Sequence, residues 1–376
     1  MNERPSTKRD LLGRLTGPGP KRILALDGGG IRGVITLCML ERIESVLQRL
    51  NGNPDLRLAD YFDLIGGTST GAIIAAGLAA GMSVAEMGVA YRELGASVLS
   101  RRSMKVWQSL LDEKPLREGL KSQFGDIRLG DPAIRTGLCV VAKRADTNST
   151  WPLHNHPQGK FYAENRSLLL REVVRASTAA PLFFVPEKID VGQGIRGLFV
   201  DGGVSLAANP AWLLFLVATL KGYSFRWATG ANRLLLVSVG TGSWPWEADL
   251  RQRKGGKSWD WILNVPLMLM KDATEQTELL LQYLSRSPTA RPMDEEVGAL
   301  DEDLLTGEPA LSYLRYNVSL DRSTLGRLGL EKLANKLSDI QDMSSTTTVD
   351  ALTQIGNASS KQICDDHFPA VFNVAP

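Results

Sequence analysis

A G-T-S-T-G pentapeptide with a central serine, Ser69, constrains this chain more than any other stretch. An apolar, strand-like run precedes it at residues 61–65, and a run of small residues with helical character follows it at 72–80. A strand, a sharp turn and a helix in this order form a nucleophile elbow, whose turn is too tight for flanking Cβ atoms. The pattern therefore predicts Ser69 as a nucleophile between the turn residues Gly67 and Gly71. The N-terminus of the following helix favours negative charge beside it.

The rest of the chain alternates between strand-like and helical stretches. Strands are expected at residues 22–26, 136–142, 198–200, 233–239 and 314–320, and helices at 34–50, 84–97, 167–175, 211–220, 258–284 and 325–340. Such alternation predicts an α/β fold with a mostly parallel central sheet. We expect a flexible leader at residues 1–21, a main domain at 22–320 and a C-terminal helical extension at 321–376 packed on the same domain. The uncharged stretch 64–85 is long enough to span a bilayer, but the elbow inside it favours a buried strand and helix.

Composition excludes several classes of partner. The 376 residues carry a net charge of +2 with no long basic block, so a nucleic-acid polymer is not an expected partner. Cys38, Cys139 and Cys364 are odd in number and far apart, which indicates reduced thiols rather than disulfides or a metal site. No cofactor and no metal are expected. Residues 1–22 are polar and lack the apolar core of a signal peptide, so we expect a cytoplasmic location.

Three consecutive glycines, Gly28, Gly29 and Gly30, lie between the first predicted strand and the first long helix. With Arg32 and Gly33 they match G-x-G-x-x-G, the pattern of a dinucleotide-binding loop. That site also needs an acidic residue at the end of the next strand, where this chain has the serine elbow instead. Backbone N–H groups at a helix N-terminus bind a tetrahedral oxyanion as well as a phosphate. The pattern favours an oxyanion hole, and a nucleotide-binding module stays open as the alternative.

A serine nucleophile needs a proton acceptor, and two arrangements fit the residues. The order Ser69, Asp201, His367 matches a Ser-His-Asp esterase of the α/β-hydrolase type, although His367 lies in a polar tail with no strand before it. His154 and His156 are expected to be solvated in a polar loop at residues 146–158. The second arrangement is a dyad without histidine, in which Asp201 acts directly. Asp201 follows a predicted strand and precedes two glycines, but an ordinary turn aspartate fits its spacing equally well.

Four motifs in one order resemble the patatin-like phospholipase family. They are DGGGIRG, GTSTG, ASTAAPLFF and VDGG, the last followed by Asn209-Pro210, and the resemblance spans residues 22–316. Each motif is weak alone, and the combination is specific. The resemblance implies a three-layer α/β/α sandwich and a serine lipid acyl hydrolase of phospholipase A type. Two departures, Ala72 after the elbow and Asp-Gly-Gly in place of Asp-Gly-Ala, lie within what the family is expected to tolerate.

The resemblance also implies roles for individual residues. Ser69 is the implied nucleophile and Asp201 the implied proton acceptor of a Ser-Asp dyad, with Gly202 and Gly203 completing the Asp-Gly-Gly motif. Gly28, Gly29 and Gly30 are the implied oxyanion hole. Arg32 lies in the same loop and is the candidate contact for a lipid phosphate.

The expected partner is a phospholipid membrane surface, with the protein peripheral to the inner membrane when active. Four tryptophans, Trp244, Trp246, Trp259 and Trp261, alternate with basic residues and suit a membrane interface, although packing of these rings in the core is slightly favoured.

Compact bacterial members of the family resemble CBASS-type antiviral effectors, which degrade membrane phospholipid when a cyclic dinucleotide activates them. Arg101, Arg102, Lys105 and the region after Asp321 are candidate positions for such an activator, with solvated surface charge as the simpler interpretation. A homo-oligomer stays open. A non-catalytic storage or interaction protein is a further alternative.

Overall fold

A single mixed sheet runs through the molecule. The computed structural model describes residues 10–99, 111–181, 183–192, 194–245, 258–300 and 302–374. Within these residues nine strands pair in the order β5-β6-β3-β2-β1-β7-β9-β8, and β4 pairs with β3 off this path. The strands are β1 Lys21–Leu26, β2 Leu64–Thr68, β3 Gly137–Arg144, β4 Ser149–His154, β5 Glu187–Asp190, β6 Arg196–Asp201, β7 Leu234–Val239, β8 Ser285–Arg286 and β9 Leu311–Tyr316.

Six of these strands, β3, β2, β1, β7, β9 and β8, are parallel to one another, which confirms the mostly parallel sheet. β4, β5 and β6 pair antiparallel at one side. The central strands β1 and β7 are almost entirely buried because helices cover both faces, as parallel sheets require.

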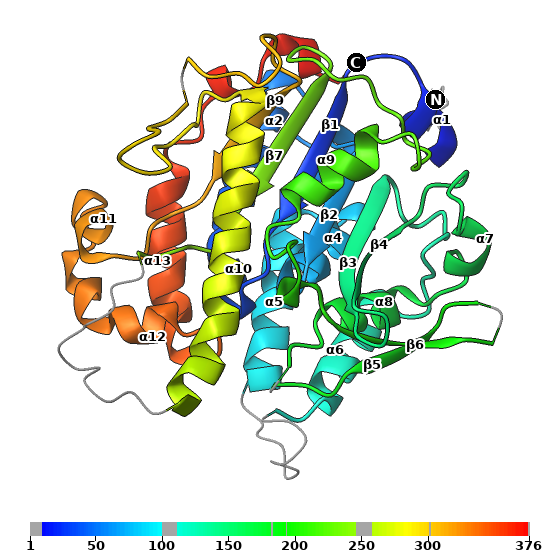
Figure 1. Ribbon diagram of the computed structural model, residues 1–376, viewed down its shortest axis with the longest axis horizontal. Coiled ribbons are helices and arrows are strands. Elements are labelled where there is room, and N and C mark those ends of the chain that lie inside the picture. Colours follow the sequence, from blue (N-terminus) through cyan, green and yellow to red (C-terminus); the bar gives the residue numbers. More distant parts are fainter. Residues whose placement is uncertain are drawn as a thin grey trace, which may run out of the picture.

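Helices form a layer on each face of the sheet (Figure 1). They are α1 Leu11–Thr16, α2 Gly33–Leu50, α3 Leu58–Tyr61, α4 Thr70–Ala79, α5 Val84–Leu99, α6 Lys114–Phe124, α7 Tyr162–Asn165, α8 Leu170–Ser177, α9 Ala211–Thr219, α10 Ser258–Tyr283, α11 Arg322–Arg327, α12 Leu337–Gln341 and α13 Val349–Ser360. Leu24 and Leu26 of β1 face the core under α2, α4, α5 and α13, whereas Ile23 and Ala25 face the core under α9 and α10. The chain is therefore a three-layer α/β/α sandwich, as expected.

The uncharged stretch at residues 64–85 forms β2 and α4, whose apolar side chains are buried on all sides. α4 consequently shows no polar face, since a helix that packs on a sheet and on other helices has no side toward water. Among the described residues, no helix combines the length and the apolar character needed to cross a bilayer.

Several element predictions differ from the structure. The strand expected at residues 61–65 begins only at Leu64, because Leu58–Tyr61 forms the short helix α3. The loop expected at 146–158 contains strand β4, which pairs with β3 at the sheet margin and tolerates Pro152 there. The helix expected at 325–340 is divided into α11, a 3-10 helix at Glu331–Lys336 and α12.

The leader expected at residues 1–21 is ordered where it is described. Leu11–Thr16 forms α1, capped by the Asp10 side chain, and Leu15 is fully buried. Trp227 donates its indole N–H to the Leu15 carbonyl at 2.7 Å, so this segment packs on the α9 side of the sheet.

Candidate active site

Two strands that run toward each other bring Ser69 and Asp201 together. β2 pairs with β3 up to Thr68 opposite Val141, and β6 pairs with β3 from Ala142 opposite Asp201. β4 occupies the other side of β3 over the same residues, so β2 and β6 share one side and meet end to end. The residue after Thr68 is Ser69. The register alone therefore places the serine beside the aspartate at the carboxyl edge of the sheet.

Ser69 has the backbone of a nucleophile elbow. Its φ of 55° and ψ of −128° lie where a side chain is disfavoured, and such strain costs on the order of 1–3 kcal/mol. A Cβ at Gly67 would lie 2.2 Å from the Gly71 carbonyl oxygen, and a Cβ at Gly71 would lie 2.3 Å from the Leu26 carbonyl oxygen. Close backbone contacts therefore require glycine at both flanking positions. This confirms the prediction that the turn is too tight for flanking Cβ atoms.

The hydroxyl and the backbone N–H of Ser69 are both hydrogen-bonded to buried side chains. Ser69 Oγ donates to Asp201 Oδ2 at 2.5 Å, and the Ser69 N–H donates to Ser177 Oγ at 2.9 Å. Ser177 is fully buried and donates its own proton to the Val141 carbonyl at 2.6 Å. Its hydroxyl thus ties the strained turn to β3. In the sequence Ser177 is recognisable only as part of the ASTAAPLFF motif, which does not indicate this role.

Asp201 is buried, with 4% of its surface exposed. Its Oδ1 accepts the Gly203 N–H at 2.7 Å, which leaves Oδ2 for Ser69. Burial raises the pKa of this carboxyl to about 6, against the opposing effects of the Ser69 and Gly203 hydrogen bonds. A carboxylate with that pKa is a stronger base than an exposed aspartate and is still ionised at neutral pH.

The three glycines of the loop are not equivalent. The Gly28 N–H donates to the Ala208 carbonyl at 3.1 Å, and a Cβ on Gly28 would lie 3.0 Å from the Ser69 Cβ. The Gly29 N–H makes only a long contact of 3.3 Å, to Thr70 Oγ1. For the Gly30 N–H no partner occurs among the described residues. Gly28 therefore allows the loop to approach Ser69 closely. The Gly29 N–H has only one long hydrogen bond and the Gly30 N–H has no partner among the described residues, so both could donate to another group.

Close packing requires glycine at the other two positions as well. A Cβ on Gly29 would lie 2.1 Å from Thr241 Oγ1, and one on Gly30 would lie 2.4 Å from the Met343 carbonyl oxygen. Gly30 also has a φ of 58°, and its carbonyl accepts the Tyr91 hydroxyl at 2.6 Å. The loop is thus held from several elements in one conformation.

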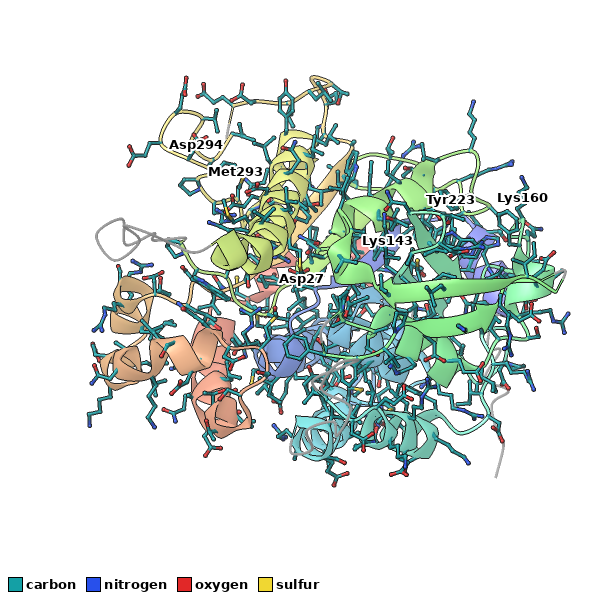
Figure 2. All side chains as sticks on the ribbon, turned by 60° about the horizontal axis from the view of Figure 1, so that its bottom comes forward. Asp27, Lys143, Lys160, Tyr223, Met293 and Asp294 are labelled. Carbon is teal, nitrogen blue, oxygen red and sulfur yellow. The ribbon has the colours of Figure 1, made fainter. Side chains whose placement is uncertain are left out.

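An ion-pair network anchors the start of this loop. Asp27, directly before Gly28, forms a bidentate pair with Arg315 of β9 at 2.7 and 3.1 Å. Arg315 also contacts Glu278 of α10 at 2.8 Å, and Glu278 accepts from Arg291 at 2.7 Å. Asp27 is buried and is labelled near the middle of the view in Figure 2, and burial raises its pKa to about 6 despite Arg315. Sequence reasoning missed this network.

Arg32 is not at the surface of the site. It is 6% exposed, its guanidinium lies 4.7 Å from the centre of the Trp244 ring, and its Nε donates to the Gly29 carbonyl at 3.3 Å. Burial lowers its pKa to about 10. The expected contact with a lipid phosphate therefore stays a prediction that the described contacts do not support. Trp244 packs against the hydrophobic core, which is the interpretation that the sequence slightly favoured for these tryptophans.

The described contacts do not assemble the alternative triad with His367. His367 lies in the 3-10 turn Asp365–His367, where its Nδ1 is 2.9 Å from Tyr316 Oη. Asp365 pairs with Arg49 in the last turn of α2, at the end farthest from the glycine loop. The Asp201 carboxylate also occupies the position beside Ser69 Oγ that an imidazole would need.

The expectation that His154 and His156 are solvated is wrong. His154 ends β4 and His156 is fully buried, and both rings pack edge-on against Phe225 at 5.4 and 4.6 Å. Burial lowers the pKa of both imidazoles to about 4, so they are neutral at pH 7. The strand pairing of β4, which the polar sequence did not reveal, is the physical reason.

Some of the other candidate residues lie outside the part of the chain that the structure describes. Arg101, Arg102, Lys105 and Trp246 lie outside the described residues, and so do the side chains of Trp259 and Trp261. Cys38 and Cys139 are buried free thiols, and Cys364 is half-buried. Within the described ranges, no cluster of three or more His, Cys, Asp or Glu residues could hold a metal ion.

Comparison with known proteins identifies the family. The family model described as patatin-like phospholipase matches residues 24–215, more than half of the chain, and includes the glycine loop, the elbow and Asp201. The chain therefore belongs to the patatin-like phospholipase family, a class of lipid acyl hydrolases. It is 28% identical to Patatin-17 of Solanum cardiophyllum over 304 residues, which cover 76% of this chain and 77% of the patatin.

Two further similarities are more limited. The chain is 31% identical over 199 residues to the cGAMP-activated phospholipase of Escherichia coli (strain TW11681), covering 51% of this chain and 54% of that protein. Among solved structures, VipD from Legionella pneumophila aligns with a TM-score of 0.35 at 14% identity, over 87% of this chain and 67% of VipD. That structural similarity is too distant to inform the site.

Proposed function

We propose that this protein hydrolyses acyl esters of phospholipids through an acyl-serine intermediate with a Ser69–Asp201 dyad. The observation that carries the proposal is the 2.5 Å hydrogen bond from Ser69 Oγ to Asp201 Oδ2 at a strained elbow. Membership of the patatin-like phospholipase family supports the substrate class.

In the proposed reaction, Ser69 Oγ attacks the acyl carbon as its proton passes to Asp201 Oδ2. The protonated Asp201 then returns the proton to the departing alcohol, which leaves as the lysolipid. A water molecule, deprotonated by Asp201, attacks the acyl-serine. As the bond to Ser69 Oγ breaks and the fatty acid is released, the proton passes from Asp201 to Ser69 Oγ. One carboxylate serves both half-reactions, so no histidine is needed.

The raised pKa of Asp201 reduces the cost of proton transfer without removing it. Against an alcohol as acidic as water, a carboxyl of pKa about 6 leaves a gap of roughly 10 pKa units, or about 13 kcal/mol. Free alkoxide is therefore inaccessible, and proton transfer must accompany attack while donors hold the oxyanion. We assign that role to the N–H groups of Gly29 and Gly30. One such donor contributes about 3 kcal/mol of transition-state stabilisation.

We further propose that the substrate is taken from a phospholipid membrane surface and that a cyclic dinucleotide activates the enzyme, as in a CBASS-type antiviral effector. Similarity to the cGAMP-activated phospholipase supports the second part. Hydrolysis of the host's own membrane lipid would be harmful without such control.

The dyad is tested with Ser69→Ala and Asp201→Ala in assays of phosphatidylcholine hydrolysis. Both variants are expected to lose activity by more than about 10³-fold while melting within a few degrees of the parent protein, because each removes a group that touches the reacting atoms. His367→Ala is the matched control and is expected to retain activity. Near-normal turnover by Asp201→Ala together with a loss in His367→Ala would instead support the Ser-His-Asp esterase. Failure of a fluorophosphonate to label Ser69 would support a non-catalytic protein.

A further inference from the structure

The G-T-G segment at residues 240–242 takes no part in the dyad, yet it lies directly against the glycine loop. β7 pairs in parallel with β1 up to Val239 opposite Leu26, so the two segments that follow these strands leave the sheet side by side. Two positions beyond that pair, Thr241 lies beside Gly28, and its Oγ1 donates to the Gly28 carbonyl at 3.0 Å. Thr241 is 3% exposed, so this hydrogen bond is largely shielded from water.

The backbone on both sides of Thr241 is fixed. The Gly240 N–H donates to the Tyr316 carbonyl at 2.8 Å, and the Gly242 N–H donates to Asn317 Oδ1 at 2.9 Å. A Cβ on Gly240 would lie 2.4 Å from Asn317 Oδ1, so close packing excludes a side chain there. The threonine hydroxyl is therefore presented to the glycine loop from a segment that β9 and the residue after it hold in place.

The bond to the Gly28 carbonyl also sets the direction of the Gly29 N–H. The two groups belong to one planar trans peptide unit, in which the C=O and the N–H point in opposite directions. Because the carbonyl is directed at Thr241, the N–H is directed to the other side, where it makes its long contact with Thr70 Oγ1 at 3.3 Å. Thr70 follows Ser69 in the chain, so the Gly29 N–H faces the elbow.

The glycine sequence makes this orientation dependent on an outside contact. Glycine populates positive and negative φ about equally, so a peptide unit between two glycines turns more easily than one between residues with side chains. The Cβ position of Gly29 lies only 2.1 Å from Thr241 Oγ1, which shows that the threonine packs directly against this peptide unit. A donor stabilises an oxyanion only where it points at the developing charge, so the contact that sets its direction matters for the rate.

We propose that Thr241 is a positioning residue that directs the Gly29 N–H toward the oxyanion of the transition state. The inference rests on the proposed acyl-ester hydrolysis and on the oxyanion hole assigned to the glycine loop. Thr241 acts through one peptide unit and does not itself touch the reacting atoms.

The role is tested with Thr241→Val, which keeps the size of the side chain without its hydroxyl, and with Thr241→Ser, which keeps the hydroxyl. Steady-state kinetics are measured on a soluble ester. Thr241→Val is expected to lower kcat by about 10- to 100-fold with KM unchanged within about twofold, because a misdirected donor is lost mainly from the transition state. Thr241→Ser is expected to keep kcat within about threefold of the parent protein, because serine supplies the same donor.

A second readout separates a misdirected donor from general damage. In a thionoester sulfur replaces the carbonyl oxygen, and sulfur is the weaker hydrogen-bond acceptor. The ratio of kcat/KM for the ester to kcat/KM for the thionoester therefore reports how well the donors act on the oxyanion. We expect Thr241→Val to lower this ratio by about five- to tenfold, since the ester loses more stabilisation than the thionoester does.

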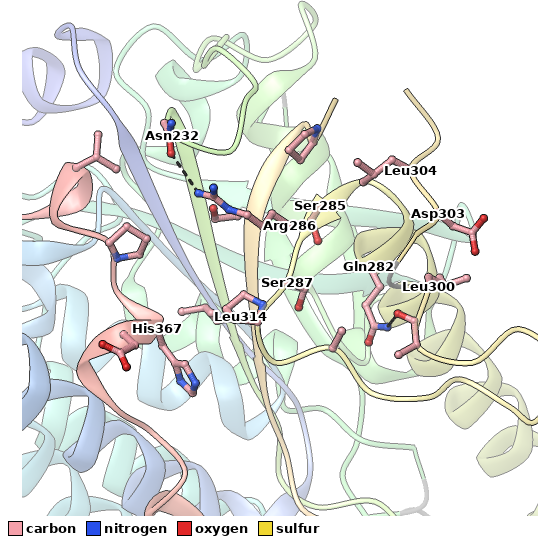
Figure 3. Close-up of a pocket in the computed structure, with 18 residues that line it drawn as sticks. Asn232, Gln282, Ser285, Arg286, Ser287, Leu300, Asp303, Leu304, Leu314 and His367 are labelled. Atoms are coloured by element: carbon pink, nitrogen blue, oxygen red, sulfur yellow. Dashed lines mark hydrogen bonds between the residues drawn. The ribbon is translucent and has the colours of Figure 1, made fainter. Parts of the chain in front are cut away.

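Ser312→Ala is the matched control. Ser312 is 4% exposed, and its Oγ donates to the Ala231 carbonyl at 2.7 Å. It lines a cavity of about 830 Å³ (Figure 3), which lies toward the amino ends of β7 and β9 because Asn232 also lines it. Thr241 follows the opposite, carboxyl end of β7. The control thus removes an equivalent buried hydrogen bond far from the glycine loop, and we expect an unchanged kcat and an unchanged ratio.

Two kinetic outcomes overturn the proposal. One is a kcat in Thr241→Val equal to that of the parent protein. The other is an equal loss of kcat in Thr241→Val and Thr241→Ser with an unchanged ratio, which would trace the effect to packing.

Crystal structures of the parent protein and of Thr241→Val test the same role without catalysis. The peptide unit between Gly28 and Gly29 is expected to turn away from its orientation in the parent protein, because its carbonyl loses the donor that holds it. An unchanged orientation overturns the positioning role. Absence of ester hydrolysis by the parent protein instead contradicts the proposed function, and the orientation of this peptide unit still decides whether Thr241 holds it.

Discussion

At the residue scale, the site depends on one hydroxyl that takes no part in the proposed chemistry. Ser177 Oγ accepts the N–H of Ser69, the residue that carries the strained backbone, and donates to β3. Without it, the Ser69 N–H would lose its hydrogen-bond partner in the interior. An unpaired buried group costs on the order of 1–3 kcal/mol, which is comparable to the strain of the elbow itself.

We therefore expect Ser177→Ala to lower kcat by about 10- to 100-fold with little change in KM, because the nucleophile loses its orientation rather than its chemistry. Thr178→Val is the matched control, since the Thr178 hydroxyl is buried in the same segment but donates to Arg175. Kinetics on a soluble ester and thermal melting of both variants are the measurements. Equal melting losses with an unchanged kcat in Ser177→Ala would assign Ser177 a purely structural role.

Asp201 gives the site a defined dependence on pH. The proposed base acts only when ionised, and burial sets its pKa at about 6. We expect kcat/KM for a soluble ester to fall about tenfold per pH unit below that value and to be flat just above it. A fall in kcat/KM centred near pH 4, the ordinary range of an exposed aspartate, would contradict the buried Asp201 as the proposed base.

The raised pKa of Asp201 also affects the stability of the fold. A salt-bridged aspartate stabilises a protein at neutral pH, whereas the buried Asp201 carboxylate destabilises it there. Because the folded pKa is raised, the unfolded chain ionises first, and the buried charge destabilises the folded state progressively from pH 4 to 6 and fully above it. Asp201→Asn is therefore expected to melt higher than the parent protein at pH 8. The difference should vanish near pH 4. Melting curves across this range test it, and a pH-independent difference would show that ionisation is not the cause.

At the scale of elements, the loop after β6 forms the rim of the site. Thr68 donates to the Ala207 carbonyl at 2.6 Å and Gly28 donates to that of Ala208, so the loop joins the elbow to the glycine loop. Leu206 in this loop is 82% exposed. Leu269 of α10 is 62% exposed, and the adjacent Met270 reaches within 3.4 Å of the Cβ position of Gly203. Exposed leucines beside a lipid hydrolase site suit contact with acyl chains.

We expect Leu206→Asp and Leu269→Asp to reduce hydrolysis of phospholipid vesicles by about 10- to 100-fold, the equivalent of one lost leucine burial. Hydrolysis of a soluble ester should be unchanged, because neither side chain touches the dyad. Leu305→Asp and Phe161→Asp, at positions with 57% and 61% exposure, are the controls away from the rim. Loss of vesicle activity in the controls to the same extent would reject a specific lipid-facing rim.

At the scale of the whole molecule, the sequence predicts features that depend on neighbouring residues and not those that depend on residues far apart in the chain. The elbow, the glycine loop and the alternation of strands and helices are local patterns, and all were recognisable. The role of Asp201 needed the resemblance to a family, since its spacing fits an ordinary turn equally well. Ser177 and Arg315 act across 108 and 288 positions of sequence, and no local pattern marks such contacts. β4 was missed because its polar sequence is typical of a loop and only its pairing with β3 makes it a strand.

The end-to-end meeting of β2 and β6 also determines when during synthesis a molecule of this kind becomes able to act. Ser69 and Asp201 are 132 positions apart, and Arg315, which anchors the glycine loop, comes later still in the chain. A ribosome must therefore have synthesised the chain beyond Arg315 before Ser69, Asp201 and the anchored glycine loop can all be in place. A shorter nascent chain carries Ser69 without Asp201 or without Arg315, so the proposed site is incomplete on it.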